Sequence, residues 1–155
     1  MSEPAVGRAS SVLLGIVEAA RTLLPEQWQG FSIGGRANLV QMYFEPNELG
    51  RKVHFEVWQR RGYLEVGLHF EAEAGANEFL FSSFQQRQPA IDAALNVEAS
   101  QPLVRVERWD KGWARVHCEM PTQGVRAVAR EANAVAHRLA AMIATLQPMY
   151  DEIMS

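Results

Sequence analysis

The sequence predicts a two-layer α+β sandwich, in which helices pack on a five-stranded, largely antiparallel sheet in the element order αβββαββα. Two stretches, residues 38–72 and 102–120, alternate apolar and polar side chains, which is typical of half-buried strands. Residues 125–146 instead repeat apolar side chains every three or four positions, which indicates an amphipathic helix. A length of 155 residues is enough for one domain with a substantial core. We therefore expect a single domain over residues 10–155 after a flexible, polar tail at residues 1–9.

The first expected helix begins at Ser10 or Ser11, both good N-caps, and is stopped by Pro25. Its apolar stripe is Leu13, Ile16, Val17, Ala20, Leu23 and Leu24. Residues 25–37 are expected to form a loop, because Gly30, Gly34 and Gly35 interrupt any periodicity.

Three strands follow at residues 38–45, 52–60 and 63–72, separated by the turns "PNELG" and Arg61-Gly62. Asn77 can then cap a helix with Leu80, Phe84, Ile91 and Leu95 on one side, and Pro89 must kink or split that helix. Two more strands flank a turn at residues 110–112. The final helix is expected to end or kink at Pro148.

The first hairpin has a defined register, because a slip of one residue would turn every side chain to the other face. Its apolar residues share one face only when His54 lies opposite His69 and Trp58 lies opposite Glu65. Lys52 then lies opposite Glu71.

The second hairpin is expected to turn through three residues, with Gly112 in the left-handed conformation. This turn gives the cross-strand pairs Trp109 with Trp113, Glu107 with Arg115, and Arg105 with His117. Apolar, aromatic and charged pairs agree on this register, which supports it.

These registers leave the sheet with one apolar face for the helices and one face rich in polar and aromatic groups, here called the polar face. It carries three of the four histidines and three of the four tryptophans. Its expected members are Gln41, Tyr43, His54, Glu56, Trp58, Glu65, His69, Glu71, Arg105, Glu107, Trp109, Trp113, Arg115, His117 and Glu119.

Aromatic residues and arginines are enriched at protein interfaces, and the polar face combines both. The expected interface residues are Tyr43, Trp58, Trp109, Trp113, Arg105 and Arg115. We therefore expect a non-catalytic protein-binding or accessory module without a cofactor, which binds another protein or a second copy of itself as a homodimer. Alternatively, the second helix or the loop with Trp28 and Phe31 covers this face within the chain.

The polar face also allows a metal-binding protein or a hydrolase-type enzyme. Opposed His54 and His69 would have Cβ atoms about 5 Å apart, so both imidazoles could reach one ion. Glu71, or alternatively Glu56, could supply a carboxylate ligand. His54, His69 and Glu71 would then form a two-histidine, one-carboxylate set with an open coordination position. The same residues could simply decorate a solvated strand face, so whether the chain is an enzyme stays open.

Two further catalytic arrangements would use residues of the last strand. His117 and Glu119, near Arg105, could form a proton-transfer pair. A Cys118–His117 nucleophile is excluded, because neighbours along a strand point to opposite faces.

The composition of the chain limits the classes of ligand and of protein that are expected. The net charge of −3 argues against a duplex nucleic-acid binder, although aromatics beside arginines leave a single-strand platform as a third hypothesis. A single cysteine excludes an intramolecular disulfide and a multi-cysteine zinc site.

The apolar run after Ser10 is interrupted by Glu18 and has no basic region before it, so neither a signal peptide nor a membrane span is expected. A cytoplasmic protein is the expectation.

The first part of the expected order, αβββαβ, resembles the core of restriction-endonuclease-like enzymes, which need an Asp opening the second strand and an E-x-K on the third. Here Glu65 is followed at that spacing by Gly67, and Glu71 by Glu73, so an active nuclease of that kind is not expected. The complete order αβββαββα resembles that of the small, acidic, dimeric type III secretion chaperones. This resemblance lies in topology alone; it implies a dimer and transfers no site residue.

Overall fold

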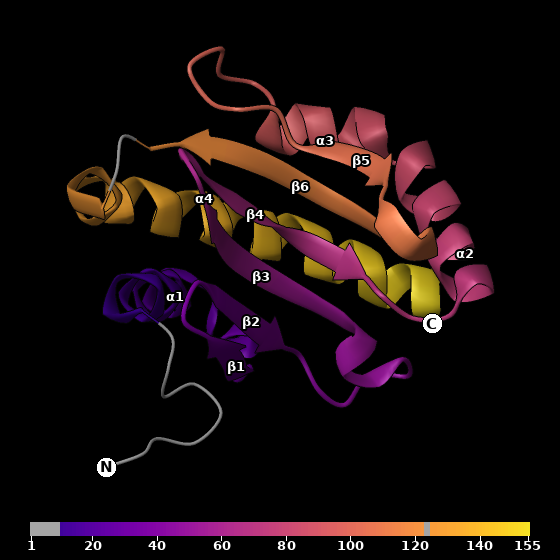
Figure 1. Cartoon of the computed structure of the whole chain (residues 1–155). Coiled ribbons are helices and arrows are strands. Elements are labelled where there is room, and N and C mark those ends of the chain that lie inside the picture. The colour runs from indigo at the N-terminus through magenta and orange to yellow at the C-terminus, as the bar shows by residue number, and fades with distance from the viewer. Residues whose placement is uncertain (1–9, 123–124) are drawn as a thin grey trace.

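The computed structural model describes residues 10–122 and 125–155. Within them the chain forms four α-helices and one six-stranded antiparallel sheet, which confirms the α+β fold class (Figure 1). The tail expected at residues 1–9 lies outside the described residues.

The sheet has the strand order β1-β2-β3-β4-β6-β5. Its strands are β1 Ser32–Arg36, β2 Leu39–Tyr43, β3 Val53–Arg60, β4 Tyr63–Phe70, β5 Arg105–Arg108 and β6 Ala114–Pro121. The helices are α1 Ser11–Leu23, α2 Ala74–Gln86, α3 Gln88–Leu95 and α4 Val125–Met154.

The helices cover one face of the sheet. Helix α4 runs behind the strands and packs against α1, while α2 and α3 lie at the end of the sheet formed by β5 and β6 (Figure 1). Phe55, Phe70 and Phe84 are among the largest fully buried side chains between the two layers. The polar face is the opposite one, turned towards the viewer in Figure 1.

The expected strand count of five is wrong, because residues 32–36 form β1 rather than a loop. Gly34 and Gly35 interrupt the alternation of apolar and polar residues by which a strand is recognised in a sequence. The hairpin with β2 nevertheless requires glycine at both positions. A Cβ at Gly34 would lie 2.9 Å from the Tyr43 ring, and one at Gly35 would lie 2.2 Å from the Leu39 carbonyl oxygen. The added strand and the divided second helix make the observed order αββββααββα, so the topology behind the chaperone resemblance differs.

Helix boundaries follow local chemistry, with two corrections. Ser10 caps α1 by accepting from two backbone N–H groups, and Pro89 divides α2 from α3. Asn77 is not an N-cap, because α2 already begins at Ala74 and the Asn77 side chain is buried. Pro148 does not end α4, which continues to Met154. Leu23, assigned to the apolar stripe of α1, is exposed.

The expected registers of both hairpins are confirmed. His54 pairs with His69 and Trp58 with Glu65, while the second hairpin makes its three expected pairs. Gly112 has φ 76°, and Lys111 before it is also left-handed at φ 62°. Alternation and turn chemistry were sufficient here because both act over a few residues.

Among residues 10–122 and 125–155, none of the helices combines the length and the hydropathy needed to cross a membrane.

Candidate functional site on the polar face

The expected polar face exists, but most of its ionisable side chains are buried. The buried members are His54, Glu56, Glu65, His69, Arg115 and His117. Larger side chains of the same face cover them: the Trp109 indole packs edge-on against His69 at 5.3 Å between ring centroids, and Tyr43 packs against His54 at 6.0 Å. The face is therefore a layer of buried charge beneath aromatic and arginine side chains.

The segments suggested as intrachain covers lie elsewhere. Trp28 and Phe31 pack against Phe44, which in turn contacts the core residue Phe55. Phe84 of α2 packs against Phe70, also on the apolar side. These contacts leave the polar face to its own side chains.

Three tryptophans form a cluster on this face, as expected. The Trp109 ring centroid lies 6.0 Å from that of Trp58 and 5.8 Å from that of Trp113. All three indoles are half-buried. We call Trp58, Trp109 and Trp113 the tryptophan cluster.

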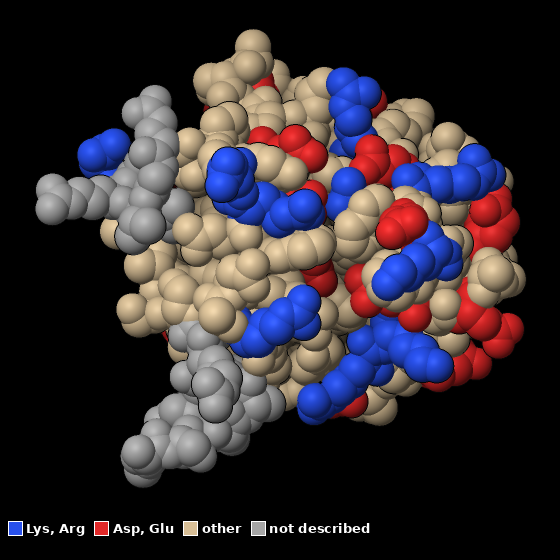
Figure 2. Space-filling model, viewed as in Figure 1, with Lys and Arg blue, Asp and Glu red and all other residues tan. Residues whose placement is uncertain are grey.

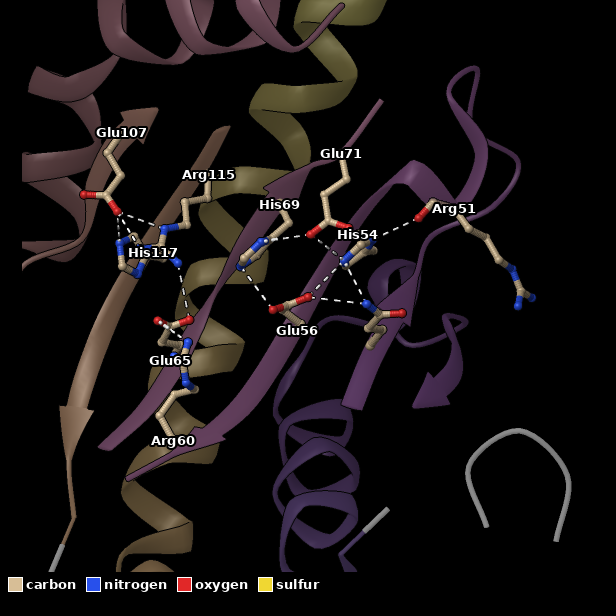
Figure 3. A network of polar contacts seen from close by, with 11 residues as sticks. Arg51, His54, Glu56, Arg60, Glu65, His69, Glu71, Glu107, Arg115 and His117 are labelled. Carbon is tan, nitrogen blue, oxygen red and sulfur yellow. Dashed lines mark hydrogen bonds and ion pairs between the residues drawn. The ribbon is translucent and has the colours of Figure 1, made fainter. Parts of the chain in front are cut away.

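Two separate polar networks lie beside the tryptophan cluster (Figure 3). The first, here called the paired-histidine network, consists of His54, Glu56, His69 and Glu71 from β3, β4 and the residue after β4. His54 Nε2 lies 3.0 Å from Glu56 Oε1 and 3.8 Å from Glu71 Oε2. His69 lies 3.3 Å from each carboxylate, through Nε2 to Glu56 and through Nδ1 to Glu71.

A backbone carbonyl determines which ring nitrogen of His54 carries a proton, and neighbouring groups shift the pKa of its imidazole. Its Nδ1 lies 2.8 Å from the carbonyl oxygen of Arg51, which can only accept, so Nδ1 carries a proton. Burial alone would lower the pKa of His54, but the hydrogen bond and the charge of Glu56 outweigh burial and raise it. Burial alone would likewise raise the pKa of Glu56, yet the hydrogen bond from His54 and the charge of His69 lower it. Each of the two groups therefore shifts the pKa of the other towards its charged form.

The second network, here called the arginine network, consists of Glu65, Glu107, Arg115 and His117. The Arg115 guanidinium contacts Glu107 at 2.7 Å and Glu65 at 3.3 Å. His117 Nε2 lies 2.8 Å from Glu107 Oε1. Burial and the neighbouring Arg115 charge lower the pKa of His117 to about 4, so it is neutral at pH 7 and donates from Nε2.

Gly67 separates the two networks. It pairs with Glu56 on one side and His117 on the other, and a Cβ at this position would lie 2.5 Å from both the His117 Cβ and the Val116 carbonyl oxygen. Only glycine lets these strands bring their polar side chains so close.

The expected interface residues differ in their exposure and in their contacts. Arg115 lies over Trp109 at 4.4 Å from the ring centroid, so it connects the arginine network to the tryptophan cluster. Arg105 is exposed, and Tyr43 lies beside His54, where it donates to Gln41 at 2.5 Å. His117 contacts Glu107 rather than the Glu119 considered from sequence.

Sequence reasoning missed two cations that stack on the tryptophan cluster. Arg60 lies over Trp58 at 4.1 Å, and Lys111 lies over Trp113 at 5.2 Å. A signal existed for Arg60, because it stands two residues after Trp58 on the same strand face. The sequence contains no comparable signal for Lys111, because this residue lies in a turn and strand alternation does not predict where its side chain points.

The possible metal ligands that the structure brings together differ from the expected set of His54, His69 and Glu71 by one member, because Glu56 takes the place of His69. One ligand atom each from His54, Glu56 and Glu71 lie within 4.8 Å of one another, and His69 adjoins both carboxylates of this group. Cys118 faces the core, where burial raises the pKa of its thiol. Comparison with known proteins finds no matching family model, curated protein or solved structure.

Proposed function

We propose that this chain is a protein-binding module whose polar face docks an acidic segment of a partner protein. The observation that carries the proposal is the tryptophan cluster, three half-buried indoles with cations stacked on them. An acidic segment is the occupant that matches both the aromatic surface and its charge.

Several cations of the polar face and its turns are available to a ligand. Arg60 stacks on Trp58, its contact with Glu65 is long at 3.5 Å, and its side chain is 37% exposed. Lys111, Arg61 and Arg105 are exposed. Figure 2 shows Lys and Arg side chains projecting across this view of the molecule.

Two carboxylates of the same region, Glu65 and Glu107, are already engaged in ion pairs. Glu65 is buried against Arg115, and Glu107 contacts both Arg115 and His117. The ion pairs with Arg115 thus offset the charge of these two carboxylates, while Arg60 and Lys111 stack on the tryptophan cluster. Complementary charge at an interface directs encounter and partner choice, and buried aromatic anchors supply most of the binding energy.

A peptide-display selection on the full-length protein tests this function. We expect selected peptides to combine Asp or Glu with an apolar anchor, and to lose binding to the variant Arg60→Glu. The matched control is Arg108→Glu, which makes the same change in charge at another exposed position. Arg108 lies next to α2, where it contacts Glu78 and Phe81. Peptides that bind both variants equally, or that lack acidic residues, would overturn the proposal.

A second copy of the chain is the competing occupant. Light scattering coupled to gel filtration, at high micromolar concentration, measures the oligomeric state of wild type, Trp58→Ala and Arg60→Glu. A dimer that both substitutions dissociate would place a second copy on this face instead of an acidic partner. A monomer, or a dimer unaffected by either substitution, supports the acidic partner.

A further inference from the structure

We propose that the paired-histidine network binds one divalent transition-metal ion through His54, Glu56 and Glu71, with His69 positioning the two carboxylates. The site is separate from the docking surface around Arg60, so either proposal can fail without the other.

The ligand atoms are already close to the spacing that an ion requires. Nitrogen and oxygen ligands about 2.0–2.2 Å from a tetrahedral ion lie roughly 3.3 Å from one another. His54 Nε2 is 3.0 Å from Glu56 Oε1 and 3.8 Å from Glu71 Oε2. All three ligand atoms lie within 4.8 Å of one another, so side-chain rotations would bring them around an ion between strands whose register is fixed by the ladder.

Hydrogen-bond accounting at His54 calls for a cation. Because Nδ1 donates to the Arg51 carbonyl, a neutral ring directs the Nε2 lone pair at the carboxylate of Glu56. A second proton would relieve that repulsion, but it would also face the side-chain amide nitrogen of Gln41, 3.2 Å from the same Nε2. Rotating the Gln41 amide would instead bring its oxygen to the position 3.4 Å from Glu56 Oε1. An ion bound by Nε2 and Oε1 removes the conflict, since it accepts both lone pairs and leaves the amide free to donate to Glu56.

His69 supplies an independent observation. It is fully buried, and neither ring nitrogen has a hydrogen-bond partner of acceptable geometry. Buried polar atoms are seldom left in this state without a functional reason or an additional ligand. Each nitrogen nevertheless lies 3.3 Å from a carboxylate, Nε2 from Glu56 and Nδ1 from Glu71, so a small shift of these side chains around an ion would let His69 donate to a metal ligand.

The donor types define the class of ion. One imidazole nitrogen with two carboxylate oxygens suits Zn²⁺, Mn²⁺ or Fe²⁺ rather than an ion that prefers thiolate. Three protein ligands leave a coordination position open. The side chain of Glu71 is 19% exposed, which gives the site a connection to solvent.

Isothermal titration of the chelator-treated full-length protein with ZnCl₂, and separately with MnCl₂, tests the site. We expect one ion per chain for at least one of the two metals. His54→Gln and Glu71→Gln should each weaken that binding by at least about tenfold, and His69→Gln by about 10–100-fold. His117→Gln is the matched control, because His117 contacts a single carboxylate and lies beside a guanidinium.

Several results would overturn the metal site. They are the absence of stoichiometric binding of both metals to wild type, binding that survives His54→Gln and Glu71→Gln, and an equal loss in His117→Gln. Circular dichroism and thermal melting of each variant exclude misfolding, and Glu71→Gln is the most conservative of them because its side chain is partly exposed and changes little in shape. Unchanged metal binding in Arg60→Glu would separate this site from the docking surface.

Discussion

The imidazole rings of His54 and His69 lie parallel on adjacent strands, with 3° between their planes and 5.9 Å between their centroids. Their direct pairing in the β3–β4 ladder places them side by side, and both rings face Glu56. Two imidazolium rings at this separation would repel each other in a buried site, so the carboxylates of Glu56 and Glu71 are needed to offset any positive charge there. Four groups from neighbouring strand positions therefore form one electrostatic unit.

Arg115 should be important for stability because it neutralises the buried carboxylate of Glu65. Removing one member of a buried ion pair leaves an uncompensated charge, so we expect Arg115→Ala to lower the free energy of unfolding by about 3–5 kcal/mol. Arg108→Ala removes a solvent-exposed contact with Glu78 and should lower the free energy of unfolding far less. Urea denaturation measures both, and similar losses in the two variants would contradict the buried role of Arg115.

Gly67 should tolerate no side chain. A Cβ there would collide with the His117 Cβ and the Val116 carbonyl oxygen, so Gly67→Ala should destabilise the fold by about 1–3 kcal/mol through overpacking. Gly15, in α1, has open space around its Cα, and Gly15→Ala should stabilise the protein by about 0.5–1 kcal/mol. Thermal and urea unfolding provide the comparison; a neutral Gly67→Ala would mean that β4 and β6 can separate at this point.

The arginine network should make stability depend on pH through His117. Its pKa is about 4 in the folded protein against 6.5 as the ordinary value, so the unfolded chain binds the extra proton first as the pH falls. The neutral imidazole therefore contributes stability that is complete above pH 6.5 and is lost between pH 6.5 and about 4. The whole loss is on the order of 3 kcal/mol.

Urea titrations at several pH values measure this effect. We expect His117→Gln to show a shallower loss of stability than wild type across that interval, because the substituted side chain does not titrate. Parallel pH profiles for the two proteins would show that His117 is not the responsible group.

Asn77 should anchor the turn between β5 and β6 to the start of α2. Its amide donates to the carbonyl oxygens of Ala72 and Gly112 and accepts from the Ala72 N–H, each at 2.9 Å. Asn77→Ala leaves these backbone groups without their partner and should reduce the free energy of unfolding by about 1–3 kcal/mol.

The control for Asn77 is Asn133→Ala, the same substitution at an exposed position of α4. It should change stability by no more than about 0.5 kcal/mol. Hydrogen exchange at the turn, residues 110–112, adds a local readout: faster exchange is expected in Asn77→Ala only.

Features that act over a few residues were predictable from the pattern of the chain. Alternation placed Val57 and Val66 inward and His54 and His69 outward, and the turn around Gly112 aligned Trp109 with Trp113. The strand β1 was missed, because Gly34 and Gly35 serve contacts with Tyr43 and Leu39 that are formed only after the hairpin closes.

The sequence by itself determined which side chains share a face of the sheet, since backbone pleating and one-residue register are local properties of a strand. Only the tertiary structure decided that the polar side chains of that face are buried rather than solvated. Burial depends on neighbours brought from other strands: Trp109 covers His69, and Arg115 reaches Glu65 fifty positions away in the chain. The register predicted that His54, Glu56 and Glu71 share a face, and the tertiary structure decided that ligand atoms of these three residues lie within 4.8 Å of one another.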